Sequence, residues 1–365
     1  MTKSKQDKMN PIYKDILVEI STPNSVGMGF LLQTGHLIVT CEHIVRGHQK
    51  VVVQSQFGKA YLKVLYLDAI LDIAFLELPK AWSTTALEIA SLATIPTEIP
   101  VWIADIPLGS FQNIIEIELV DTIEKTDKIT YLELDTPIVS EQSGAPVLDM
   151  NNRILGLNSA LYTINDTFAF ALSGDYLIQS LINYQKHQLR FPDKTIIKCY
   201  NCQKLVAENE ILQDNCPRCQ DSLVIEIDNY EPYGIALTIE NLLKQTGYQI
   251  DLSRKGPNAW EVEQGSANIQ IIYNEKDGYI IGDAILCQLP ETPSDALYQF
   301  LLEQNYLLKG LNFSVKGVDI VLSLLIFDRD LNMETGSILL KNLFERADYY
   351  DNVLVEKYGA KWLGT

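Results

Sequence analysis

The sequence predicts a multidomain protein with three successive parts: an all-β domain, a small four-cysteine module and an α+β domain. Short apolar segments separated by turn residues fill the chain as far as Asp135, two C-x-x-C pairs follow, and helical and strand patterns mix from Tyr230 onward. A chain of 365 residues also suits two or three domains better than one. We place the three parts at 11–188, 195–224 and 230–365.

Composition opposes several classes of function. The formal net charge of −18 disfavours a nucleic-acid-binding surface, since such surfaces use Lys and Arg to neutralise phosphates. Residues Met1–Ile20 lack the apolar core of a secretory signal, and no apolar run reaches the roughly 18–20 residues of a membrane helix. We therefore expect a cytoplasmic protein without nucleic-acid or membrane partners, and the C-x-x-C thiols agree with a reducing compartment.

The first part has the pattern of a β-sandwich or barrel, because it contains many short strands and few helices. A helical pattern at 175–184 closes it, with Ser173 available as the N-cap. The expected strands are rich in Val, Ile, Leu and Tyr; they are Ile16–Ile20, Gly29–Leu32, Leu37–Thr40, Val51–Gln54, Tyr61–Leu67, Ile73–Leu78, Val101–Ala104 and Ile114–Leu119.

The third part has the predicted order α-β-β-β-α-β-β-α. Gly247 ends its first helix, Asp277-Gly278 is a hairpin signal, and the last helix carries a single apolar face. The expected helices are Thr238–Thr246, Ser294–Leu308 and Met333–Lys357, and the expected strands are Ala259–Gln264, Ile269–Tyr273, Tyr279–Gln288, Phe313–Val315 and Asp319–Phe327.

A candidate nucleophile stands in the first part. Ser143 lies in Glu141-Gln142-Ser143-Gly144-Ala145-Pro146, a turn with strand-like residues on both sides. A serine hydroxyl is a poor nucleophile at neutral pH, so it needs a general base within hydrogen-bond reach and an acid that orients this base.

His43 and Asp72 are the candidates for the base and the acid. His43 follows a buried-looking strand in Leu37–Val45, and Asp72 leads into Ile73-Ala74-Phe75-Leu76, where a carboxylate is costly unless it is paired. Asp68 is the alternative acid and is better explained as a turn residue. The other histidines, His36, His48 and His187, have the surroundings of surface residues.

These segments resemble the HtrA/Deg-type, trypsin-like serine proteases of the chymotrypsin clan. Gly27-Met28-Gly29-Phe30 with His43-Ile44-Val45 is similar to G-x-G-F and T-x-x-H-V-V, the stretch 68–76 is similar to D-x-x-x-D-I-A-x-L, and the order His43, Asp72, Ser143 is that of the clan. The resemblance extends over Ile12–His187. It implies a chymotrypsin-like double β-barrel and a serine endopeptidase that cleaves protein or peptide substrates through an acyl-enzyme.

The sequence departs from this family just before the serine. The family loop reads G-N-S-G-G-P or G-D-S-G-G-P, and its first glycine contributes one of the two backbone amides of the oxyanion hole; here Glu141 and Ser143 would supply them. Glycine is common where φ is positive, so glutamate there could strain the loop. Either the loop tolerates Glu141, or an effector or the substrate orders the loop and completes the hole.

The resemblance also indicates where the substrate pocket lies. Its walls would come from the residues before the nucleophile and from the strand after it. The expected wall residues include Ile138, Asn158, Ser159 and Phe170. None of them is charged, so we expect a preference for small to medium apolar side chains.

The cysteine module predicts a metal site. Cys199 and Cys202 form one C-x-x-C pair and Cys216 and Cys219 the other, separated by 13 residues, close to zinc-site spacing. Two such pairs supply a closed site of four thiolates, which resembles a zinc ribbon and implies structural Zn²⁺. Cys41 and Cys287 stand alone in the sequence and are expected to be packed thiols.

The element order of the third part, with Leu322–Asp328 and Phe344–Tyr350, resembles the type III secretion chaperone-like (CesT/YbjN-like) fold. This family binds protein segments and commonly dimerises, so we expect a site for a regulatory protein partner and a homodimer. A rival hypothesis is a catalytically silent peptide-binding adaptor or a chaperone that retains the protease fold; Glu141 favours it and the three triad residues oppose it.

Overall fold

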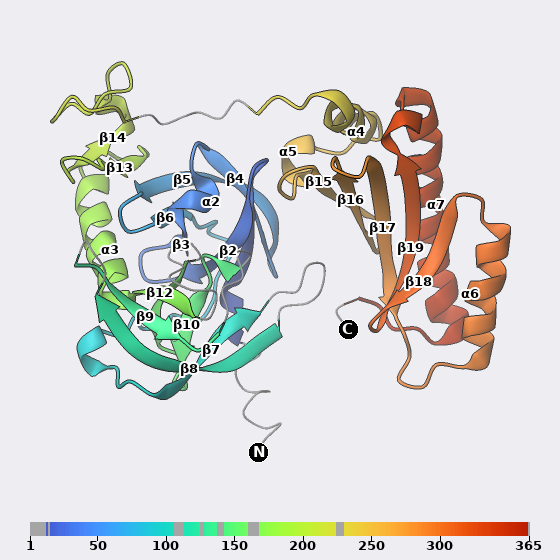
Figure 1. The fold of residues 1–365 in the computed structure, drawn as a ribbon, viewed down its shortest axis with the longest axis horizontal. Coiled ribbons are helices and arrows are strands. Elements are labelled where there is room, and N and C mark those ends of the chain that lie inside the picture. The colour runs from blue at the N-terminus through green and yellow to red at the C-terminus, as the bar shows by residue number, and fades with distance from the viewer. Residues whose placement is uncertain are drawn as a thin grey trace. The chain divides into compact units, whose positions relative to one another are not determined.

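The computed structural model describes residues 12–13, 15–105, 113–124, 128–136, 142–159, 168–223 and 230–363. The chain divides into two compact units, Met1–Asp228 and Asn229–Thr365, which are shown in Figure 1. The first unit contains two β-barrels and the cysteine segment, and the second contains a sheet with helices.

The first barrel has six strands within the described residues. They follow the order β5-β4-β1-β2-β3-β6, and a further pairing of β5 with β6 closes the barrel. Val, Ile, Leu and aromatic side chains fill its core, and β2, β3 and β6 are buried along nearly their whole length, as continuous apolar runs predict. The strands are β1 (Leu17–Ser21), β2 (Val26–Leu32), β3 (Leu37–Thr40), β4 (Lys50–Ser55), β5 (Gly58–Asp68) and β6 (Ile73–Glu77).

The second barrel closes in the order β10-β11-β12-β9-β8-β7, counted over the described ranges. The Tyr13 hydroxyl donates to the carbonyl oxygens of Trp102 and Pro146, so the chain before the first barrel is fastened to the second. The strands are β7 (Ile99–Asp105), β8 (Asn113–Glu124), β9 (Thr130–Leu134), β10 (Pro146–Asp149), β11 (Ile154–Asn158) and β12 (Ala169–Ser173). The structure thus confirms the predicted double β-barrel.

Helix α3 (Gly174–Gln188) follows the second barrel. The Ser173 side chain accepts from the amide of Asp175, which confirms the predicted N-cap, and Leu177, Leu181 and Tyr184 form the buried face. The helix contacts β11, β12 and β13, and Tyr184 packs against Tyr66 and Phe75 of the first barrel.

The cysteine segment is part of the first unit. Its strand β13 (Ile196–Lys198) pairs in parallel with β5 and antiparallel with β14 (Leu205–Ala207), so the two strands extend the sheet of the first barrel. The sequence predicted a separate module at 195–224 that carries the four cysteines and, being too short to bury a core of its own, is held together by a metal ion. In the structure the segment shares the core of the barrel instead.

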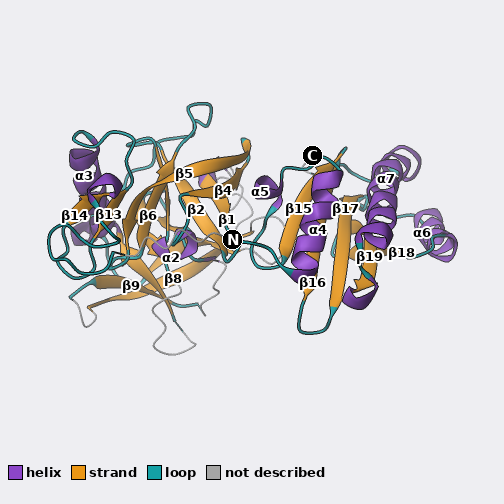
Figure 2. Cartoon of the chain, turned by 90° about the horizontal axis from the view of Figure 1, so that it is seen from above, coloured by secondary structure: helices purple, strands orange, loops and turns teal. Residues whose placement is uncertain are grey.

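The second unit contains a five-stranded antiparallel sheet, counted over the described residues, in the order β15-β16-β17-β19-β18. Helix α7 packs against β15, β16, β17 and β19 and contacts α4; Figure 2 shows both helices on the sheet. The strands are β15 (Ala259–Gln264), β16 (Ala267–Asn274), β17 (Tyr279–Gln288), β18 (Leu311–Lys316) and β19 (Asp319–Phe327), and the helices are α4 (Gly234–Gln245), α5 (Ile250–Ser253), α6 (Asp295–Leu307) and α7 (Met333–Tyr358).

The predicted element order of this unit agrees with the structure, apart from the short helix α5. The bounds of β15, β17 and β19 are those expected from the sequence, whereas α4 begins at Gly234 and not at Thr238. Among the described residues, no helix combines the length and apolarity needed to span a membrane.

Candidate active site

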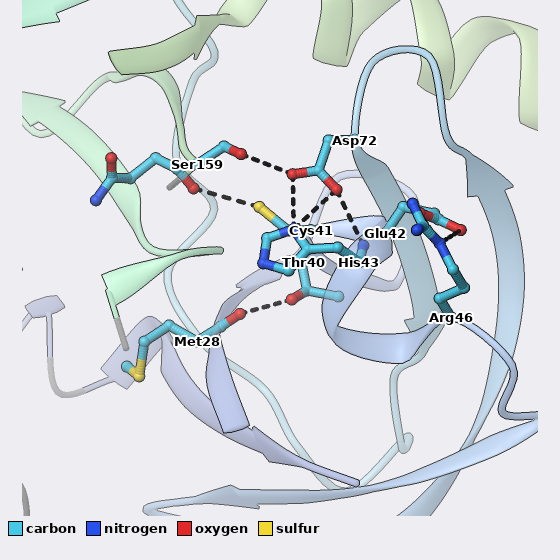
Figure 3. Close-up of polar contacts among 9 residues, drawn as sticks. Met28, Thr40, Cys41, Glu42, His43, Arg46, Asp72 and Ser159 are labelled. Atoms are coloured by element: carbon cyan, nitrogen blue, oxygen red, sulfur yellow. Dashed lines mark hydrogen bonds and ion pairs between the residues drawn. The ribbon is translucent and has the colours of Figure 1, made fainter. Parts of the chain in front are cut away.

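His43 and Asp72 are neighbours because β3 and β6 are paired. Thr40 of β3 lies opposite Ala74 of β6, so the short helix α2 (Glu42–Val45) after β3 meets the turn before β6. The Nδ1 of His43 lies 3.0 and 2.9 Å from Oδ1 and Oδ2 of Asp72, and the backbone amide of His43 donates to Oδ1 at 3.0 Å (Figure 3). The predicted base and acid therefore contact each other directly.

Asp72 is buried and is held by donors from both barrels. Its residue is 1% exposed and its φ is 54°, a left-handed conformation that aspartate tolerates better than most residues. Ser159 follows β11 of the second barrel, and its hydroxyl donates to Oδ2 of Asp72 at 2.7 Å (Figure 3). Together with the two donors of His43, this contact supplies the hydrogen bonds that a buried carboxylate requires.

The contact of Ser159 was missed by the sequence analysis, which placed this residue in the wall of the substrate pocket. The structure shows that its side chain is directed at Asp72. The two residues are 87 positions apart and belong to different barrels, so no local pattern reports their contact.

The loop that carries Ser143 is fastened to β2 of the first barrel. The amide of Met28 donates to the carbonyl oxygen of Ser143 at 2.8 Å, and Thr40 Oγ1 donates to the carbonyl oxygen of Met28 at 2.6 Å. Gly144 has a φ of 91°, and a Cβ on it would overlap the Met28 carbonyl oxygen. Glycine is therefore required after the serine for both conformation and space.

The Gly27 position explains why the stretch before Phe30 is rich in glycine. A Cβ on Gly27 would overlap the Ile44 side chain and lie 3.1 Å from the carbonyl oxygen of Ser143. The absence of a side chain there lets β2 lie against both the helix of His43 and the loop of Ser143.

The carbonyl oxygen of Asn158 links the loop of Ser143 to the segment that carries His43. The carbonyl oxygen of Asn158 accepts from the Gly144 amide at 2.8 Å and from the Cys41 thiol at 3.3 Å. Gly144 adjoins Ser143, and Cys41 stands two residues before His43. The fold thus brings the candidate nucleophile and the His43–Asp72 pair to the same junction between the barrels.

Cys41 is a packed thiol, as predicted. Its residue is fully buried, and burial, reinforced by the charge of Asp72, raises its pKa well above the usual value. The thiol therefore stays neutral at physiological pH, and its role here is to donate a hydrogen bond.

Of the predicted pocket residues, Asn158 contacts the nucleophile loop and Phe170 contacts Ser159. The side-chain amide of Asn158 donates to the carbonyl oxygen of Gln142 at 3.4 Å, and the carbonyl oxygen of Phe170 accepts from the Ser159 amide at 3.2 Å. Both side chains are buried. Ile138 and Glu141 lie outside the described residues, so the pocket wall and the oxyanion hole predicted for them remain predictions.

Asp68 is a turn residue, as the sequence indicated. Its Oδ1 accepts from the amides of Ile70 and Leu71 at 3.1 Å each, which shapes the turn between β5 and β6. Its Oδ2 accepts from Lys198 Nζ at 2.8 Å.

The four cysteines of the two C-x-x-C pairs converge on one point. Their sulfur atoms all lie within 4.8 Å of one another, with Cys199 to Cys219 at 3.6 Å and Cys202 to Cys216 at 3.8 Å. Sulfurs bound about 2.3 Å from a tetrahedral zinc ion would lie about 3.8 Å apart. The spacing of these thiols therefore fits a metal ion.

The two halves of the cluster have the same backbone geometry. The amides of Gln203 and Gln220 donate to the carbonyl oxygens of Cys199 and Cys216 at 2.9 Å each, and both glutamines have positive φ. Burial raises the pKa of Cys199, whereas the amides of Cys219 and Arg218 and the adjacent thiols lower the pKa of Cys216, so the two coupled thiols shift in opposite directions. A thiolate is the form that binds metal.

The first part of the chain is similar to a known protein family. Residues 27–157 match the family model of the trypsin-like peptidase domain, and this stretch contains His43, Asp72 and Ser143. This part of the chain is therefore similar to trypsin-like peptidase domains, and its curated relatives are of the HtrA type. The match agrees with the family resemblance that the sequence motifs predicted.

Two curated HtrA-type proteins illustrate this similarity. The rat "Serine protease HTR4" is 27% identical over 177 residues, covering 46% of this chain and 36% of the relative. The human "Serine protease HTRA4" is 27% identical over 183 residues, covering 45% and 36%. The match thus spans little more than a third of the length of these relatives.

Among solved structures, the active form of the Rv3671c protease from M. tuberculosis matches at 17% identity and a TM-score of 0.44, covering 50% of this chain and 86% of that one.

Proposed function

We propose that this chain is a serine endopeptidase that cleaves protein or peptide substrates with His43, Asp72 and Ser143 as its catalytic triad. The observation that carries the proposal is the network around Asp72: two carboxylate oxygens hold His43 Nδ1 at 3.0 and 2.9 Å, at the junction where β2 holds the loop of Ser143. A neutral imidazole fixed through Nδ1 presents Nε2 as the base.

The residues take the following roles in this mechanism. His43 Nε2 removes the proton of the Ser143 hydroxyl as the oxygen attacks the substrate carbonyl carbon, and the resulting imidazolium is stabilised by Asp72. The imidazolium then gives the proton to the leaving amine, and the acyl-enzyme on Ser143 remains. Water, deprotonated by His43, hydrolyses the acyl-enzyme. The backbone amides of Glu141 and Ser143 would donate to the oxyanion.

The four-cysteine cluster is proposed to bind structural Zn²⁺. Four thiolates close the coordination sphere, so the ion would stabilise the segment and would not take part in catalysis. Elemental analysis of the purified protein should find about one zinc per chain, and Cys216→Ser should lower the content. A zinc content near zero in wild-type protein would contradict this assignment.

The second unit is proposed to bind a regulatory protein partner and to support a homodimer, as its resemblance to CesT/YbjN-like proteins implies. A cytoplasmic location, as expected from the sequence, would require such control, because an unregulated peptidase endangers host proteins. Deletion of residues 230–365 tests whether the second unit regulates the peptidase. If it does, the deletion should change the cleavage rate; if the unit acts as a chaperone instead, the deletion should leave the rate unchanged.

The activity is tested by cleavage of an unfolded protein such as reduced casein. Wild-type protein should produce peptides, while Ser143→Ala and His43→Ala should lose at least about 10³-fold in rate, as expected for triad residues. Equal cleavage by wild type and both variants would assign the activity to a contaminant and overturn the proposal.

A catalytically silent peptide-binding adaptor is the second candidate. It is favoured by Glu141, which stands where related proteases have the glycine of the oxyanion hole. An adaptor would bind casein with equal affinity in wild type and Ser143→Ala and would cleave it in neither. The contacts of Asp72 favour the peptidase, because peptide binding does not require a buried carboxylate that orients a histidine.

A further inference from the structure

The cysteine segment is built onto the strand that leads to Asp72. Ile196 and Ile197 of β13 pair in parallel with Tyr66 and Leu67 of β5, the last strand before the Asp72 turn. The Thr195 hydroxyl adds a hydrogen bond to the carbonyl oxygen of Val64 at 2.9 Å. The position of β13 is thus fixed relative to the end of β5.

Lys198, the last residue of β13, forms an ion pair with Asp68, the last residue of β5. Its Nζ lies 2.8 Å from Asp68 Oδ2, and the two side chains are 20% and 0% exposed. The Tyr66 hydroxyl lies 3.3 Å from the same oxygen. A carboxylate buried to this degree needs a counter-charge, and Lys198 provides it.

Asp68 in turn shapes the backbone that presents Asp72. Its other oxygen accepts the amides of Ile70 and Leu71, and Asp68 pairs across the sheet with Ile73, so the four residues between them form a closed turn. Asp72 is the last residue of this turn and is held at positive φ. A shift of the Asp68 carboxylate would therefore move the carboxylate that orients His43.

Lys198 also adjoins the four-cysteine cluster. Cys199 is the next residue, its amide donates to the carbonyl oxygen of Lys204 at 2.9 Å, and Lys198 pairs with Leu205. Cys199 and Cys202 lie in the loop that joins β13 to β14. Cross-linking this loop to Cys216 and Cys219 through a metal ion would hold the hairpin, and with it Lys198, in place.

We infer that Lys198 is a positioning residue for the peptidase and that it makes catalysis depend on the state of the four-cysteine cluster. A filled cluster holds the Lys198–Asp68 pair, which holds the turn of Asp72. Loss of the metal releases the hairpin and slows catalysis without touching the triad. This inference rests on the proposed peptidase function and on metal binding at the cysteines.

The first test compares charge variants at this pair by the rate of labelling of Ser143 with a fluorophosphonate. Lys198→Met should lower the maximal labelling rate by about tenfold or more, because displacements of about 1 Å in catalytic groups cost about 10²-fold. The probe concentration at half-maximal rate should stay near the wild-type value, since the binding surface is unchanged. Lys198→Arg should keep most of the rate, because it retains the charge.

Two further variants separate positioning from loss of structure. Asp68→Asn combined with Lys198→Met removes both charges and retains an acceptor for the turn amides, so it should recover most of the lost rate. Lys63→Met is the matched control, since Lys63 also lies on β5 and contacts the carbonyl oxygen of Asp193 and Glu208, outside the turn of Asp72. It should label at the wild-type rate.

The second test links the pair to the cysteines. Removal of bound metal with a chelator should slow labelling of wild-type protein by a factor similar to that caused by Lys198→Met. Chelation should slow Lys198→Met little further, because metal removal and the substitution both act through the Lys198–Asp68 contact. Metal content and circular dichroism are measured on the same samples to show that Lys198→Met binds metal and is folded.

Defined results would overturn the inference. The inference is contradicted if folded Lys198→Met labels at the wild-type rate, or if Lys63→Met loses as much rate as Lys198→Met. It is also contradicted if chelation and Lys198→Met slow labelling in a fully additive way. These outcomes differ from failure of the peptidase proposal itself, in which the wild-type protein shows no label at Ser143.

Discussion

The hydroxyl of Ser159 donates to Oδ2 of Asp72 at 2.7 Å, and the same oxygen lies 2.9 Å from Nδ1 of His43. Ser159 belongs to the second barrel, whereas His43 and Asp72 belong to the first. The contact therefore makes the orientation of the histidine depend on how the two barrels meet.

Ser159→Ala removes one donor from a buried carboxylate. A hydrogen bond to a charged group contributes about 1.5–3 kcal/mol, which corresponds to roughly ten- to hundredfold in rate if it is lost in the transition state. We expect fluorophosphonate labelling to slow by this factor. Ser173→Ala is the control, because it removes a buried hydroxyl that caps α3 and should affect stability more than labelling. Similar labelling rates for Ser159→Ala and wild type would show that the contact does not support catalysis.

Gly144→Ala should prevent the nucleophile loop from forming. The new Cβ would overlap the Met28 carbonyl oxygen and would also be strained at a φ of 91°. Gly247→Ala has nearly the same φ, 94°, but meets nothing within 4 Å, so it should cost only about 1–2 kcal/mol of stability. Urea unfolding and labelling of both variants check this difference. Equal losses of stability and of labelling rate in the two variants would disprove the close approach of β2 to the loop of Ser143.

The buried carboxyl of Asp351 in α7 leads us to expect that the stability of the second unit depends on pH. Burial raises the pKa of this carboxyl above its usual value, although the Ser266 hydroxyl and the Asn352 amide donate to it. The folded state then binds the proton more tightly than the unfolded state. The free energy of unfolding should therefore fall as pH rises from about 3.8, the unfolded value, through the raised folded pKa.

Asp351→Asn should remove this slope and stabilise the second unit at pH 7. Hydrogen exchange of the α7 amides in the full chain measures the effect, and Asp277→Asn, in an exposed turn, is the control. A steeper decline of stability with pH in Asp351→Asn than in wild type would refute the assigned direction.

Glu141→Gly tests whether the nucleophile loop is switched. If an effector or substrate must order the loop, glycine should restore an oxyanion donor and raise the labelling rate, by up to about 10²–10³-fold. If the loop tolerates glutamate, the variant and wild type should react alike. Labelling rates of the two proteins without added substrate distinguish the cases.

Much of the site could be predicted from local sequence. His43, Asp72 and Gly144 each stand beside a buried strand, and the backbone geometry that they require leaves a pattern of glycine, turn residues and apolar runs. The four cysteines were equally predictable, because metal-binding spacing is a local property. Asp68 was correctly expected in a turn for the same reason.

Contacts between distant segments could not be predicted in this way. Ser159 was expected in the pocket wall because its strand position was known but its partner was not. The pairing of β13 with β5 was missed because a three-residue strand carries no signal of which edge it joins. The Lys198–Asp68 pair follows from that pairing, so it too emerged only with the tertiary structure.

The central claim, that Ser143 is an activated nucleophile, is tested most directly by intact-mass analysis after treatment with a fluorophosphonate. The account predicts one adduct per chain on wild-type protein, located on Ser143 by peptide mapping, and no adduct on Ser143→Ala. His43→Ala should label at least about 10³-fold more slowly. An unlabelled wild-type protein, or an adduct that persists in Ser143→Ala, would contradict the account.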